Sequence, residues 1–139
     1  MILFNQKTVS PDYGEVLDYQ IPLKANGRDK VGFKAFDLLS YDKVRNTAWI
    51  LELKVSDNDN DSLLHSVLEA YTYLKTVHKE KLLDDFSLDT SAELKAAVLS
   101  IEGDRRHREY KALDSMPFLK QLISRLGIEV FFLSEEPTF

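Results

Sequence analysis

The sequence contains no cysteine, which excludes a disulfide framework, a cysteine-ligated zinc site and an iron-sulfur cluster. This absence fits a reducing compartment, and a cytoplasmic protein is the expectation. Glycine and proline are also scarce, at five and four of 139 residues, which argues against a disordered or low-complexity chain. No apolar run reaches the length of a membrane span, and residues 1–4 are too few for a signal peptide, so a soluble protein is predicted.

Basic residues are outnumbered, because 18 Lys and Arg face 23 Asp and Glu, which leaves a net charge of -5. A chain of this balance has no general attraction for phosphates, so nucleic-acid binding would depend on a local basic patch. One candidate patch consists of Arg105, Arg106, Arg108 and Lys111. Such a run either contacts phosphates or forms an ordinary solvated surface, and the sequence leaves both interpretations open.

The pattern of apolar residues predicts one α/β domain over residues 1–139, with a core at about residues 15–133. Period-two runs and buried apolar runs predict strands at residues 15–24, 30–41, 47–55, 94–101 and 128–133. The pair Asn26-Gly27 is a hairpin turn signal between the first two strands. Strand-helix-strand-helix-strand after a hairpin predicts a mixed sheet with right-handed crossovers. The charged segment 79–93 is expected to be mobile and the tail 134–139 loosely held.

Two helices are expected between the strands. The first is capped by Asp61 or Ser62, and the second is capped by Ser115 and ends at Gly127. Helical spacing gives the first an apolar stripe made of Leu63, Leu64, Val67, Leu68, Tyr71, Leu74 and Val77. On this wheel His65 and Glu69 lie roughly 60° and roughly 100° beyond Leu68, which favours a solvated helix face for both.

Three charged residues stand out in the strands. Alternation places Glu52 and Lys54 on one face with Leu53 opposite, and a turn near residues 44 and 45 would set Asp37 across from Glu52. Two adjacent carboxylates repel each other, and Mg²⁺, which prefers hard oxygen ligands, would relieve the repulsion. Lys54 would then orient or deprotonate a water, or stabilise developing charge. The alternative is a cross-strand salt bridge on a solvated sheet, against which the apolar neighbours argue.

The run Phe36-Asp37-Leu38-Leu39, followed by Ile50-Leu51-Glu52-Leu53-Lys54-Val55 with fourteen residues between the two acids, resembles the PD-(D/E)XK signature. The predicted order of elements downstream is similar as well. The resemblance implies an α/β fold with a restriction-endonuclease-like mixed sheet flanked by helices. It further implies that Asp37, Glu52 and the Leu53 main-chain carbonyl bind Mg²⁺ or Mn²⁺. In that family the lysine assists the water that hydrolyses a phosphodiester bond, a role that would fall to Lys54.

Two further positions of that family have candidates in this chain. Many relatives place another acid before the first strand, where Glu15 is available, and many carry Gln or Lys on the following helix, where His65 or Glu69 stands. The predicted function is a metal-dependent nuclease acting on nucleic acid, expected to be DNA. The alternative is an inactive domain of the same fold that serves nucleic-acid binding or protein assembly. A homodimer or a larger complex is compatible with either.

Overall fold

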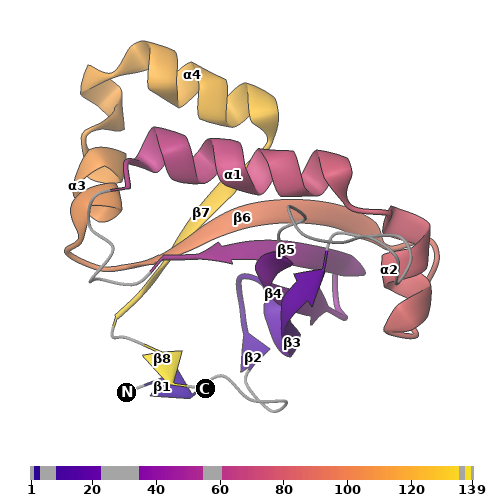
Figure 1. Ribbon diagram of the computed structural model, residues 1–139. Helices are drawn as coiled ribbons and strands as arrows, with labels where there is room; N and C mark the ends of the chain where they lie inside the picture. The colour runs from indigo at the N-terminus through magenta and orange to yellow at the C-terminus, as the bar shows by residue number, and fades with distance from the viewer. Residues whose placement is uncertain (1, 4–8, 23–34, 55–60, 135–136, 139) are drawn as a thin grey trace.

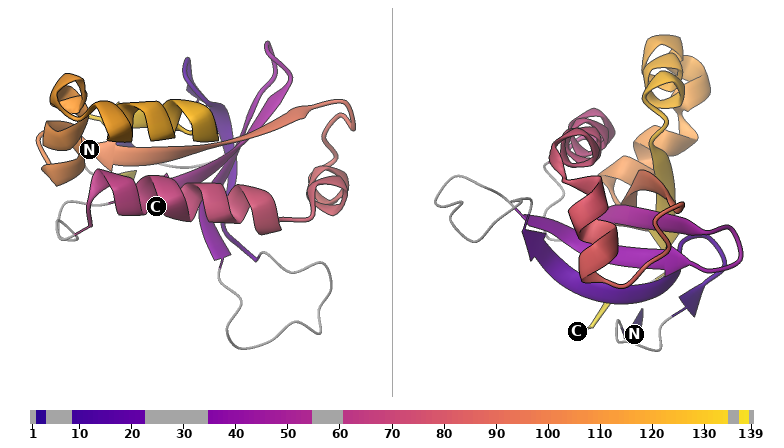
Figure 2. Two further views of the ribbon diagram at one scale, coloured as in Figure 1. Left: turned by 90° about the horizontal axis from the view of Figure 1, so that it is seen from above. Right: turned by 90° about the vertical axis from the view of Figure 1, so that its right-hand side faces the viewer.

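The computed structural model describes residues 2–3, 9–22, 35–54, 61–134 and 137–138 (Figure 1). The fold is mixed α/β, with a six-stranded mixed sheet that curls as a half-barrel and four flanking helices (Figure 2). The α/β class and the mixed sheet predicted from the sequence are therefore confirmed. The expected turn at Asn26-Gly27 and the start of the second predicted strand lie outside the described residues.

The sheet has the strand order β2-β3-β4-β5-β6-β7. Strands β2 to β5 pair antiparallel, whereas β5, β6 and β7 run parallel. Their bounds are Val9–Ser10, Gly14–Pro22, Ala35–Asp42, Thr47–Leu53, Glu93–Ile101 and Glu129–Leu133. A separate two-stranded parallel sheet joins β1 (Ile2–Leu3) to β8 (Pro137–Thr138), so the tail expected to be loose contains a strand.

The helices are α1 (Leu63–Thr76), α2 (Lys79–Asp85), α3 (Arg105–Lys111) and α4 (Pro117–Leu126), with a 3₁₀ turn at Leu113–Ser115. Helices α1 and α4 lie side by side over β6, as the two views of Figure 2 show. Among the described residues, none of the helices has both the length and the apolar content needed to cross a membrane.

Several predicted elements need correction. The segment expected to be mobile contains α2, which buries Leu82 and Leu83 and is therefore anchored to the core. The basic run, for which no helix was predicted, is helix α3. Ser115 does not cap α4, which begins with Pro117 after Met116 as N-cap, whereas Gly127 ends it as expected, with φ 70. The cap of α1 is Ser62, whose side chain accepts from the His65 backbone N–H.

The face of α1 that packs on the sheet keeps part of the predicted stripe, since Leu63 and Val67 are buried and Tyr71, Leu74 and Val77 pack against the same core. Val67, Ala70 and Tyr73 are buried against the apolar side chains of β5 and β6. Leu64 and Leu68 are 39% and 42% exposed instead. The helix is therefore rotated relative to the prediction, and this rotation turns a different set of polar side chains toward the sheet.

The turn between β4 and β5 sets the register of the two strands. The Asp42 carboxylate accepts hydrogen bonds from the backbone N–H groups of Val44 and Arg45, an arrangement that stabilises a tight turn. Leu38 then pairs with Leu51, and Asp42 pairs with Thr47. One step further along this register, Asp37 faces Glu52, as the sequence predicts.

Candidate functional site

The three predicted charged residues come from adjacent strands. Asp37 lies in β4, Glu52 lies in β5, and Lys54 follows β5 directly. The Leu53 backbone N–H donates to Asp37 Oδ2 at 2.9 Å, and the Lys54 backbone N–H donates to the Leu99 carbonyl of β6 at 2.8 Å. These bonds continue the sheet past the end of β5 and hold the three charges together.

The two carboxyl groups are poorly solvated. Glu52 is only 5% exposed, and its Oε2 atom has no hydrogen-bond partner within the described structure. Burial, together with the neighbouring Asp37 carboxylate, raises the pKa of Glu52 to about 9. Burial also raises the pKa of Asp37, against the effect of the Leu53 N–H. In the metal-free protein the pair therefore retains a proton at neutral pH.

A divalent cation fits this donor set. An oxygen that is buried and lacks a partner costs free energy, and two acids in contact repel unless a proton or a cation lies between them. Hard carboxylate oxygens are the ligands that Mg²⁺ prefers, and it binds proteins through one or two of them. The Asp37 and Glu52 carboxylates would hold such an ion, and the Leu53 carbonyl belongs to the same segment.

Lys54 is a buried cation held by acids. Its Nζ atom donates to Asp61 Oδ2 at 2.8 Å and to Glu69 Oε1 at 3.0 Å, and it lies 3.5 Å from Glu52 Oε1. Burial lowers the pKa of Lys54, but the hydrogen bonds to Asp61 and Glu69 outweigh this effect and raise it above its usual value. The group is an ammonium ion at neutral pH, which favours orienting water and stabilising negative charge over removing a proton.

Two residues on or beside α1 join this group. Asp61 was interpreted from the sequence only as a helix cap, yet its carboxylate pairs with Lys54 and with His65 Nδ1 at 3.0 Å. The expectation of a solvated Glu69 is wrong, because its side chain is 21% exposed and bound to Lys54. His65 is largely exposed, at 58% for its side chain. The signal available in the sequence is the spacing of four residues between successive members of Asp61, His65 and Glu69.

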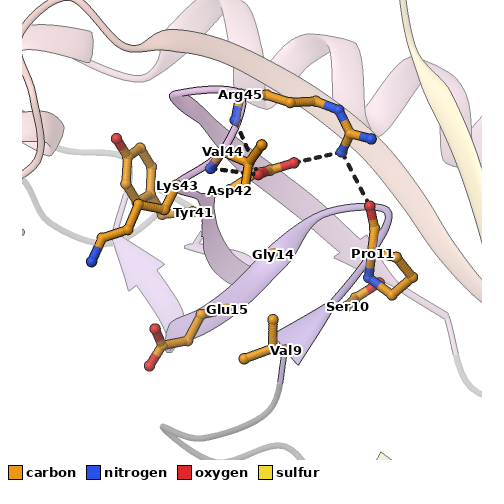
Figure 3. Close-up of a pocket in the computed structure, with 10 residues that line it drawn as sticks. All are labelled: Val9, Ser10, Pro11, Gly14, Glu15, Tyr41, Asp42, Lys43, Val44 and Arg45. Carbon is orange, nitrogen blue, oxygen red and sulfur yellow. Dashed lines mark hydrogen bonds and ion pairs between the residues drawn. The ribbon is translucent and has the colours of Figure 1, made fainter.

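Glu15 does not belong to the site. It pairs with Tyr41, which lies four residues along β4 from Asp37, or roughly 13 Å at about 3.3 Å per residue. There Glu15 is exposed and lines a pocket beside the ion pair of Arg45 and Asp42 (Figure 3). The sequence does not reveal how β3 pairs with β4. This pairing places Glu15 too far from Asp37 to bind the same metal ion.

Arg106 does not belong to the predicted basic surface patch. Arg106 is 0% exposed, and its guanidinium donates to Asp104 Oδ2 at 2.7 Å, to Ser100 Oγ at 2.8 Å and to the Asp61 carbonyl at 3.0 Å. A buried guanidinium with these partners does not meet a phosphate, so the prediction for Arg106 is wrong. Arg105, Arg108 and Lys111 remain candidates, with Arg105 half-buried and paired to Glu109 at 3.2 Å.

Comparison with known proteins adds no assignment. No protein-family model matches the chain, and neither the curated proteins nor the solved structures contain a match to it. The chemical features of the site are a buried pair of acids, one of them with an oxygen that has no partner in the described structure, and a buried ammonium beside them.

The raised pKa of Glu52 has a measurable effect on stability in the metal-free protein. The folded state binds one more proton than the unfolded chain between the unfolded pKa, about 4.3, and the folded one, so stability falls as pH rises through this range. The fall approaches about 1.4 kcal/mol per pH unit. Urea unfolding of the wild type and Glu52→Gln with EDTA at pH 5 to 9 should show the variant gaining relative stability as pH increases.

The control for this measurement is Glu102→Gln, since Glu102 is exposed and its substitution leaves the buried pair unchanged. The stability of this control should follow the wild type across the whole range. Parallel curves for the wild type and Glu52→Gln would contradict the assignment of a bound proton to the buried pair.

Proposed function

We propose that the chain is a Mg²⁺-dependent nuclease that hydrolyses phosphodiester bonds of DNA. The observation that carries the proposal is the buried Asp37–Glu52 pair, in which Glu52 Oε2 has no partner among the described residues, next to the ammonium of Lys54. A simple cross-strand salt bridge would be exposed and would leave no acid oxygen unpaired. The burial of Glu52 and Lys54, at 5% exposure each, argues against that alternative.

The strand arrangement supports a restriction-endonuclease-like fold. The two acids occupy neighbouring antiparallel strands, β4 and β5, and α1 crosses over from β5 to the parallel strand β6. Helix α1 also contributes side chains to the site through Glu69. This is the order of elements that the resemblance to the PD-(D/E)XK family implies.

Each residue has a role in the proposed reaction. The carboxylates of Asp37 and Glu52 would hold Mg²⁺, which would supply Lewis-acid stabilisation of the phosphate and favour ionisation of the attacking water. Lys54 donates hydrogen bonds from a fixed ammonium, which orients the attacking water and stabilises the negative charge that develops on the phosphate oxygens. Asp61 and Glu69 hold Lys54 in position and keep it protonated.

The test is cleavage of plasmid, linear and single-stranded DNA by the purified chain with Mg²⁺ or Mn²⁺. We expect cleavage that EDTA abolishes and that Asp37→Asn reduces by at least about 100-fold, because the variant weakens metal binding at the reacting phosphate. Asp84→Asn, which changes an exposed acid on α2, is the matched control and should retain wild-type cleavage.

The opposite result has a clear meaning. If the folded wild type cleaves none of these substrates with either metal, and Mg²⁺ does not bind at Asp37 and Glu52, the chain is not a nuclease. The result would then favour a domain of this fold that serves binding or assembly.

A further inference from the structure

A second group of metal-ligating side chains lies on the α1 side of the site. Asp61, His65 and Glu69 each offer a ligand atom, and these atoms lie within 4.8 Å of one another. His65 Nδ1 is 3.0 Å from Asp61 Oδ1 and 3.4 Å from Glu69 Oε1. The proposed nuclease mechanism uses Asp61 and Glu69 only through Lys54 and does not use His65.

The separations between these atoms suit a small cation. Transition metals and zinc bind nitrogen and oxygen ligands at about 2.1 Å, which gives neighbouring ligands a separation of about 3.0 Å in an octahedron and about 3.4 Å in a tetrahedron. The separations from His65 Nδ1, 3.0 Å to Asp61 Oδ1 and 3.4 Å to Glu69 Oε1, fall in this range, the first as a hydrogen bond in the metal-free protein. An ion that replaces the imidazole proton would be within reach of all three residues.

The carboxylates of Asp61 and Glu69 contact both Lys54 and His65. Lys54 binds Asp61 Oδ2, whereas His65 faces the other oxygen, Oδ1. Glu69 Oε1 is shared between Lys54 and His65, while Oε2 lies 3.5 Å from the Tyr73 hydroxyl. A cation beside His65 can therefore bind while Lys54 keeps its shorter contact, the one to Asp61.

The ligands are also held in place. Ser62 caps α1 and accepts from the His65 backbone N–H at 3.0 Å, which fixes the first turn of the helix. The Asp61 carbonyl accepts from the buried Arg106 at 3.0 Å, and the Leu63 backbone N–H donates to Glu109 at 3.1 Å. The segment that carries Asp61 is thus tied to α3 on both sides, which lowers the cost of ordering a binding site.

Charge in the surrounding cluster favours a further cation. Asp37, Glu52, Asp61 and Glu69 contribute four carboxyl groups, and Lys54 contacts three of them. The single positive charge of Lys54 is shared among these three carboxyl groups. Mg²⁺ at Asp37 and Glu52 would leave Asp61 and Glu69 with the single charge of Lys54 between them.

We propose that Asp61, His65 and Glu69 form a second cation site that takes a transition-metal ion in preference to Mg²⁺. An imidazole ligand favours Mn²⁺, Co²⁺ and Zn²⁺, because Mg²⁺ prefers oxygen ligands and loses its water reluctantly. The site goes beyond the proposed nuclease chemistry and does not depend on it, since it binds its ion in the absence of DNA and of cleavage.

The experiment titrates chelator-treated Asp37→Asn/Glu52→Gln protein with Co²⁺ in excess Mg²⁺, followed by visible absorption and by calorimetry. The double variant removes the inner acids, so a single equivalent of Co²⁺ that Mg²⁺ does not displace is expected at the second site. Adding His65→Ala or His65→Gln should weaken Co²⁺ binding at least about tenfold and change the absorption bands, since the nitrogen ligand is lost.

The matched control is His78→Asn, which removes an exposed histidine from the start of α2 but keeps a side chain that caps a helix. It should bind Co²⁺ as the parent does. Equal Co²⁺ affinity with and without His65, or displacement of Co²⁺ by Mg²⁺, would overturn the proposal. If the wild type does not cleave DNA, the proposed nuclease function fails, whereas the Co²⁺ titration tests only the second cation site. The failure of one proposal is therefore distinguishable from the failure of the other.

Discussion

Replacing Lys54 with methionine is expected to slow Mg²⁺-dependent DNA cleavage by about 10²- to 10⁴-fold while Mg²⁺ still binds. The ammonium lies 3.5 Å from Glu52 Oε1 and is fixed by Asp61 and Glu69, so in the proposed mechanism it would act on the reacting groups without being a metal ligand. Its removal takes away a positive charge and leaves the metal-binding carboxylates in place. The Mg²⁺ affinity should therefore stay the same or increase.

The measurement combines single-turnover cleavage with calorimetric titration of Mg²⁺, and a thermal melt confirms that the variant is folded. Lys81→Met, which changes a lysine with a 40% exposed side chain paired with Asp85 on α2, is the control and should cleave at the wild-type rate. Wild-type cleavage by Lys54→Met would remove Lys54 from the mechanism. Loss of Mg²⁺ binding together with cleavage would show that Lys54 acts by maintaining the metal site.

Replacing Arg106 with methionine is expected to lower the free energy of unfolding by about 3–5 kcal/mol. The guanidinium is fully buried and bonds to Asp104, whose carboxylate is 3% exposed. Methionine fills part of the space but leaves this carboxylate buried without its counter-charge. It also removes the hydrogen bond that holds the Asp61 carbonyl beside the candidate site.

Urea unfolding measures this loss, and Lys111→Met is the control because Lys111 is an exposed member of the same helix. The control should change stability by no more than about 0.5 kcal/mol. Adding Asp104→Asn to Arg106→Met should recover part of the loss, because the two residues form one buried pair. An Arg106→Met protein as stable as the wild type would contradict the structural role assigned to Arg106.

The central part of the candidate site follows from local rules in the sequence. Side chains alternate along a strand, so Glu52 and Lys54 share a face whatever the rest of the chain does. The turn at residues 43–46 is short, and its length determines that Asp37 lies across from Glu52. Asn46 in this turn has φ 49°, which asparagine tolerates, and the Asp42 carboxylate accepts hydrogen bonds from the turn backbone.

The tertiary structure decides which other residues surround Asp37, Glu52 and Lys54. Apolar residues extend around more than one face of α1, so the sequence pattern does not tell which face packs; contact with β5 and β6 exposes Leu64 and Leu68 and brings Glu69 to Lys54. Glu15 is excluded by the pairing of β3 with β4. A pattern along the chain reports neighbours three or four residues apart, whereas these contacts join distant segments.

The burial of Arg106 is another feature that the sequence pattern does not predict. Within the run of basic residues 105–111 it is indistinguishable from its neighbours, and a basic run is ordinarily solvated. Burial became possible only because β6 supplies Ser100 and the cap of α3 supplies Asp104, which together with the Asp61 carbonyl meet the guanidinium. The sequence by itself determined five strands along the chain and the three central charges, because short-range periodicity encodes them. Only the packing of α1 and α3 on the sheet decided which further polar groups surround those charges, since burial and pairing depend on residues brought together from afar.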